Sequence, residues 1–164
     1  QSGFLNLLEP NEQGRTDLVD IPTNAHRMGF KRRGSSTMND PKGNYRIEFH
    51  QEGNDEDLNV ELLGLSKHTE WILFAPYRFD HSLVRIPFIH QLSLDIGQYA
   101  PRSVFVEVFL STANGQVGQS DYQGVYVLQE RISRDKDRVD IKRLDREDIA
   151  ELSDMLGRDL SAWG

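Results

Sequence analysis

Short runs of residues that alternate strictly between apolar and polar side chains recur along this chain, and they favour a fold built on β-sheet. The clearest run is residues 44–50 (NYRIEFH), in which Tyr45, Ile47 and Phe49 fall on one face and polar side chains on the other. A period of two places successive side chains on opposite faces of a strand. The run therefore predicts a strand that is buried on one face only.

Four further segments have strand character, and all five are joined by short connections. We expect strands at residues 26–33, 44–50, 70–75, 102–110 and 124–130. Pro76 ends the third strand, and a connection rich in Gly, Ser and Asn at residues 112–123 separates the last two, which is typical of an antiparallel hairpin. The strands are therefore expected to form one mostly antiparallel sheet.

A helix is expected at residues 81–96, between the third and fourth of these strands. Asp80 or Ser82 can cap its N-terminus, and Gly97 follows its last turn. Its apolar residues recur at helical spacing, which predicts that one side of the helix packs on the sheet.

A second helix is expected near the C-terminus, where Asp145 can act as its N-cap. Strands, one embedded helix and one terminal helix together indicate an α+β fold with a mostly antiparallel sheet. We expect residues 1–25 to be an irregular lead-in and residues 26–164 to form the domain.

Composition excludes several classes of function. The chain has 164 residues with 19 Lys and Arg against 26 Asp and Glu, so its net charge is −7. This sign argues against nucleic acid as a partner, because binding to it needs a cationic surface. The chain has no cysteine, which excludes disulfides, thiolate metal sites and cysteine nucleophiles. Its apolar stretches are far too short to span a membrane.

The turn that follows the first expected strand is the first candidate site. Gly34, Ser35 and Ser36 leave backbone N–H groups open, and Arg33 and Lys42 place positive charge on either side of them. Such a turn can wrap a phosphate group. The alternative is a solvated turn with basic neighbours, and the pattern alone favours this alternative.

Glu130 is the second candidate, since it ends an apolar strand. Its carboxylate could pair with Lys42 or bind a ligand at the end of the sheet; the alternative is a surface ion pair. No metal site is expected, because the five histidines lack ligand spacing and the acidic run at residues 52–57 lacks the pattern of a calcium loop.

The ordered set of short motifs in this chain resembles the spore-coat CotH kinase family of atypical, kinase-like proteins. The matching segments are Arg33-Gly34-Ser35-Ser36, Pro41-Lys42 with Tyr45, Gly64-Leu65 with Trp71, Asp80 with Leu83 and Arg85, GQYAPR at 97–102, VEVF at 106–109, YQGVYVLQERI at 122–132 and RVDI at 138–141. The resemblance covers roughly residues 26–144.

The resemblance implies a sheet like that of a protein-kinase N-lobe and an atypical kinase that uses ATP and Mg²⁺ to phosphorylate Ser or Thr of a coat or surface protein. It assigns nucleotide binding to Arg33, Gly34, Ser35, Ser36, Lys42 and Glu130, with Lys42 on the phosphates. It assigns no catalytic residue. It also implies a bacterial protein that is secreted to a cell surface or spore coat.

Members of this family also carry a second, larger part with an Asp-x-Asp metal motif, and no such segment occurs here. The chain is therefore expected to be an N-terminal lobe or a fragment whose partners are a nucleotide, a protein substrate and the C-terminal lobe. We expect no ATP or Mg²⁺ to be held by this chain alone, so enzyme activity stays open. The alternative is a non-catalytic structural or binding module of a surface protein.

Overall fold

The computed structural model describes residues 2–75, 77–112, 116–135 and 138–139, together with Asp154 and Gly157. The chain divides into two compact units, Gln1–Ile132 and Ser133–Gly164. Within the second unit, Arg134 and Val139 form an isolated bridge. The expected C-terminal helix lies outside the described residues. The sheet, the helix and the candidate site all belong to the first unit.

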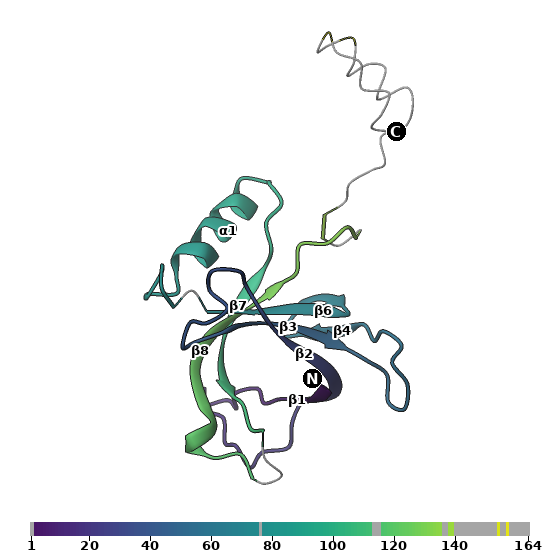
Figure 1. Ribbon diagram of the computed structural model, residues 1–164, viewed down its shortest axis with the longest axis vertical. Helices are drawn as coiled ribbons and strands as arrows, with labels where there is room; N and C mark the ends of the chain where they lie inside the picture. Colours follow the sequence, from purple (N-terminus) through teal and green to yellow (C-terminus); the bar gives the residue numbers. More distant parts are fainter. Residues whose placement is uncertain are drawn as a thin grey trace. The chain divides into compact units, whose positions relative to one another are not determined.

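The first unit consists of a curled six-stranded sheet, a two-stranded ladder and one α-helix (Figure 1). In chain order its elements are β1 (Ser2–Leu7), β2 (Asn24–Arg33), β3 (Asn44–Phe49), β4 (Val60–Leu62), β5 (Leu65–His68), β6 (Glu70–Phe74), α1 (Arg85–Asp95), β7 (Ser103–Phe109), the 3-10 helix η1 (Gln119–Asp121) and β8 (Tyr122–Glu130).

The large sheet has the strand order β1-β2-β3-β6-β8-β7, and every neighbouring pair is antiparallel. All five expected strands are present, and β7 and β8 form the expected long hairpin. The prediction of a mostly antiparallel sheet is therefore confirmed. The alternation is clearest in β3, where Ile47 and Phe49 are buried, whereas β6 buries four residues in a row, Glu70 to Leu73.

The hydrophobic core lies on one face of the sheet, which we call the inner face. It is defined by Met28, Ile47, Phe49, Trp71, Leu73, Tyr126 and Leu128. Ile47 lies opposite Trp71 in the β3–β6 register, and both are fully buried. Val60, Leu62 and Leu65 of the small β4–β5 ladder belong to the same core cluster, so this ladder helps to cover the inner face.

Residues 2–7 were expected to be irregular, and this expectation is wrong. They form β1, which pairs with β2 from Ser2 opposite Gly29 to Leu7 opposite Asn24. Phe4 is 69% exposed at the edge of the sheet, whereas Leu5 packs against the core. Apolar residues thus occur on both faces of β1, so the sequence lacks the alternation that marks β3.

The helix α1 is shorter than expected and does not pack into the core. It begins at Arg85, whose backbone N–H donates to the buried carboxylate of Asp80 at 2.9 Å. A hydrogen bond from Ser82 is the largest of the causes that lower the pKa of Asp80. No residue of α1 is buried. The expectation that its apolar side packs on the sheet is therefore wrong.

Candidate functional site

Two arginine side chains hold the second half of the loop that joins β2 to β3, residues 34–43. Arg32 donates to the backbone oxygen of Asp40, and its guanidinium lies against Gly43. A Cβ atom at Gly43 would be 2.7 Å from Nε of Arg32, so only glycine leaves room for this contact. The carboxylate of Asp40 is buried and pairs with Arg78. These contacts fix the path of the loop that carries the predicted phosphate-binding residues.

The predicted turn residues Arg33, Gly34, Ser35 and Ser36 all lie exposed at the start of this loop. Gly34 has a φ of 127°, and a side chain at this position would collide with Thr37, so the turn requires glycine. Arg33 is the last residue of β2, opposite Asn44. The four residues therefore form an open, basic and glycine-containing turn, as the sequence predicts.

Lys42, at the other end of the loop, reaches β8 on the inner face of the sheet. Its Nζ donates to the backbone oxygen of Val125 at 2.5 Å and lies 4.5 Å from the ring centroid of Tyr126. Gly124 leaves space beside it, since a Cβ there would be 3.4 Å from Nζ. Burial lowers the pKa of Lys42. Within the described residues, no carboxylate forms an ion pair with Lys42.

Aromatic rings and a second cation surround Lys42. Tyr45 stacks on Phe30 with ring centroids 4.4 Å apart and lies 6.4 Å from the ring of Tyr126. Burial, together with the nearby Tyr45, raises the pKa of Tyr126 to about 12, against the opposing charge of Arg32. Two cationic side chains and a cluster of rings thus meet where the loop returns to the sheet.

Glu130 is not part of this cluster. It is 1% exposed, and its oxygens accept the backbone N–H groups of Ser66 (3.3 Å) and Arg102 (3.1 Å). The guanidinium of Arg102 pairs with it at 2.7 Å. Five residues of strand, or about 17 Å, separate Glu130 from Val125, where Lys42 binds. Of the alternatives for Glu130, the pairing with Lys42 is wrong, and the observed ion pair is internal.

Sequence reasoning missed the residues that hold the site together. Arg32, Asp40 and Arg78 fix the loop. Arg102 and Ser66 donate hydrogen bonds to the carboxylate of Glu130. Ser66 and Glu130 are 64 residues apart in the chain. The available signal was Arg102, which lies in the GQYAPR segment at residues 97–102 that carries part of the resemblance.

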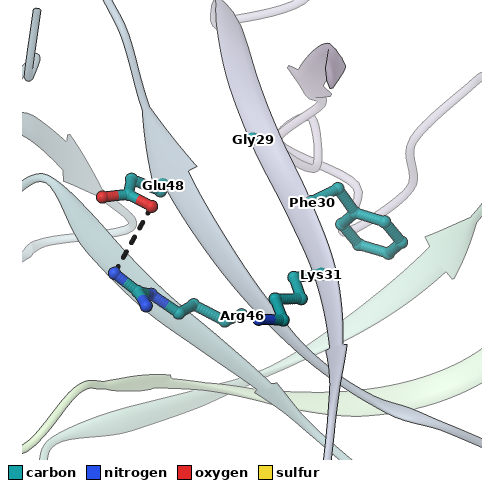
Figure 2. A pocket seen from close by; sticks show the side chains of 5 residues that line it. All are labelled: Gly29, Phe30, Lys31, Arg46 and Glu48. Atoms are coloured by element: carbon teal, nitrogen blue, oxygen red, sulfur yellow. Dashed lines mark ion pairs between the residues drawn. The ribbon is translucent and has the colours of Figure 1, made fainter. Parts of the chain in front are cut away.

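A shallow pocket of about 200 Å³ lies over β2 and β3 and does not include Lys42. It is lined by Gly29, Phe30, Lys31, Arg46 and Glu48 (Figure 2). Arg46 pairs with Glu48 at 3.3 Å and with the buried Glu70, so its charge is already neutralised. In the β2–β3 register Lys31 lies opposite Arg46, on the face away from Ile47 and the core. This pocket is separate from the predicted site.

The described residues contain neither a metal-ligand cluster nor a helix of membrane-spanning character. No group of three or more His, Asp or Glu side chains among the described residues is arranged to hold a metal ion. Among the described helices, none combines the length and the apolar character needed to cross a bilayer.

The comparisons with known proteins agree with the motifs. A search of curated proteins finds no match to this chain. The family model described as CotH kinase protein matches residues 30–162, which include the end of β2, all of β3 to β8 with α1, and the whole of the loop that carries Lys42. The match covers most of the chain, and the chain therefore belongs to the CotH kinase protein family.

Proposed function

We propose that this chain binds the phosphates of ATP at Lys42, as part of an atypical protein kinase that modifies Ser or Thr of a coat or surface protein. The observation that carries the proposal is the environment of Lys42. It is a partly buried cation held by a carbonyl oxygen and an aromatic face, with no carboxylate ion pair in the described part of the chain. The N-lobe-like role of the sheet and a location on a cell surface or spore belong to the same proposal.

The charge on Lys42 supports phosphate as its ligand. Burial disfavours the charged ammonium and lowers its pKa, whereas a nearby anion favours the charged form. A phosphate oxygen would therefore supply the countercharge that Val125 and Tyr126 do not. Hydrogen bonds to charged groups contribute about 1.5–3 kcal/mol, which corresponds to roughly a tenfold to hundredfold gain in affinity.

The exposed turn completes the proposed site from the other end of the loop. The backbone N–H groups of Gly34, Ser35 and Ser36 are accessible to a phosphate, and Arg33 adds a charged donor. Mg²⁺ would enter with ATP, because this ion is usually bound through phosphate oxygens and few protein carboxylates. We assign Glu130 a positioning role, since it ties Ser66 of β5 to Arg102 beside β7.

A binding measurement with matched lysine variants tests the proposal. In a protein that carries this chain together with the C-terminal lobe, we expect Lys42→Ala to weaken the binding of ATP and Mg²⁺, measured by calorimetry, at least tenfold. Lys31→Ala is the control, because Lys31 is an exposed lysine on the opposite face of the sheet. Circular dichroism checks that both variants fold. Equal affinity in both variants would refute the proposal and favour a non-catalytic binding module.

A further inference from the structure

The helix α1 presents an apolar face to solvent. Val84, Phe88, Leu92 and Ile96 follow one another at every fourth position, and they are 51%, 67%, 45% and 69% exposed. Residues four apart lie in one row along a helix, so these side chains form a continuous ridge. Ile89, which is 52% exposed, flanks the ridge. We call these five residues the α1 ridge.

The orientation of α1 agrees with a ridge that faces solvent. At about 100° per residue, the α1 ridge falls within an arc of roughly 140°. Pro87, His90, Ser93 and Leu94 point to the other side, and they are the partly buried residues of the helix. The helix therefore turns its less apolar side toward the rest of the unit and its most apolar side outward.

Two charged residues lie in the same arc, and both oppose the helix dipole. Arg85 is at the N-terminus of α1 and Asp95 at its C-terminus, whereas the dipole favours the reverse arrangement. The Arg85 side chain is 76% exposed, and its Nε lies as far as 3.8 Å from the carboxylate of Asp80, so this ion pair is loose. Asp95 accepts one hydrogen bond, from Gln91 at 2.8 Å. Each charge would be better placed beside the opposite end of another helix.

We propose that the α1 ridge binds a second copy of this chain, with the two α1 helices antiparallel. The two-fold axis crosses the ridge at the level of residue 90 along the helix. In that arrangement Arg85 meets Asp95 of the second copy, and Phe88 meets Leu92 of the second copy. Val84 likewise meets Ile96 of the second copy. All three pairs are symmetric about position 90, so one face serves both copies, as a two-fold interface requires.

The apolar area of the α1 ridge determines how strong a dimer we expect. Its five side chains expose roughly 500 Å² of apolar surface per copy, which is large for a monomer but below the ~800 Å² per partner of a standard interface. We therefore expect a weak dimer, with a dissociation constant in the micromolar range. This inference does not depend on ATP binding.

Charge reversal combined with mixing tests the arrangement. Arg85→Asp places two acids at each end of the dimer, and Asp95→Arg places two bases there. By analytical ultracentrifugation of the whole chain, we expect each variant alone to dimerise at least tenfold more weakly. An equimolar mixture of the two variants restores both opposite-charge pairs, so we expect it to dimerise like the unaltered chain.

Phe88→Asp provides an independent variant, because its exposed position leaves folding unaffected while a charge enters the ridge. We expect it to abolish the dimer, with circular dichroism unchanged. A chain that stays monomeric up to about 200 µM, well above the micromolar dissociation constants of weak complexes, would overturn the proposal. So would a dimer that resists Phe88→Asp, or charge variants that the mixture does not rescue.

Discussion

Tyr126 combines the packing of the core with the electrostatics of the candidate site. It is 1% exposed, its ring lies beneath the ammonium of Lys42, and its pKa is raised to about 12 mainly by burial. A buried phenol resists ionisation because the phenolate loses its hydration. The same residue therefore stabilises the sheet and forms one wall of the cation site.

The raised pKa of Tyr126 predicts a loss of stability at alkaline pH. The unfolded phenol ionises near pH 10 and the folded one near pH 12, so the contribution is complete below pH 10 and falls as the pH rises to 12. The loss amounts to at most about 2–3 kcal/mol of unfolding free energy. Urea unfolding between pH 9 and pH 12 measures it. Tyr126→Phe should be less sensitive to pH over this interval, and an identical slope in both proteins would contradict the assignment.

Glu130 provides a second prediction at this scale. Glu130→Ala removes the carboxylate that accepts from the N–H groups of Ser66 and Arg102 and that pairs with the Arg102 guanidinium. We expect it to lower the unfolding free energy by about 1–3 kcal/mol, because buried hydrogen bonds are lost while the Arg102 side chain is 41% exposed and can be hydrated. Glu107→Ala, which removes an exposed glutamate of β7, is the control and should cost below about 1 kcal/mol. Similar losses for both variants in urea unfolding would show that the buried pair contributes little.

Among the elements, β3 and α1 differ most in how much they contribute to the core. Ile47 in β3 is fully buried opposite Trp71, whereas Ile89 in α1 is 52% exposed. The two residues are chemically identical, so a matched pair of substitutions separates burial from residue type.

We expect Ile47→Ala to lower the unfolding free energy by about 2–5 kcal/mol, because it leaves a cavity in the core. Ile89→Ala should change it by about 0.5 kcal/mol or less, since alanine also has the higher helix propensity. Thermal and urea unfolding at low protein concentration measure both, where the proposed dimer is absent. A large loss for Ile89→Ala would show that α1 packs into the core.

At the scale of the whole molecule, the local sequence pattern predicted the sheet. The features that the sequence did not predict depend on contacts between residues far apart in the chain. The alternation in β3 and the hairpin chemistry between β7 and β8 are local, and both elements occur where expected. The strand state of β1 comes from its pairing with β2, which the mixed pattern of residues 2–7 does not encode. The apolar side of α1 was taken as a core face, although helical spacing alone cannot say what covers it.

In the candidate site, too, nearby residues predict some features, whereas others depend on contacts between distant residues. The turn at Gly34 and the presence of Lys42 at the other end of the same loop follow from the local sequence, and the structure has both. The contact of Lys42 with Val125 spans 83 residues, and that of Glu130 with Arg102 spans 28. Such contacts depend on strand order, which the sequence pattern does not give. The nucleotide-binding role of the turn residues, Lys42 and Glu130 stays a prediction.

The most direct measurement is the pKa of Lys42 itself, followed by nuclear magnetic resonance of its side chain with and without ATP and Mg²⁺ in the protein that also carries the C-terminal lobe. In the free protein we expect a pKa below the ordinary value of 10.5, because burial lowers it. Bound phosphates would favour the charged ammonium, so ATP should raise this pKa, while the pKa of the exposed Lys31 stays constant. A pKa of Lys42 that does not change at saturating ATP would contradict phosphate binding at this residue.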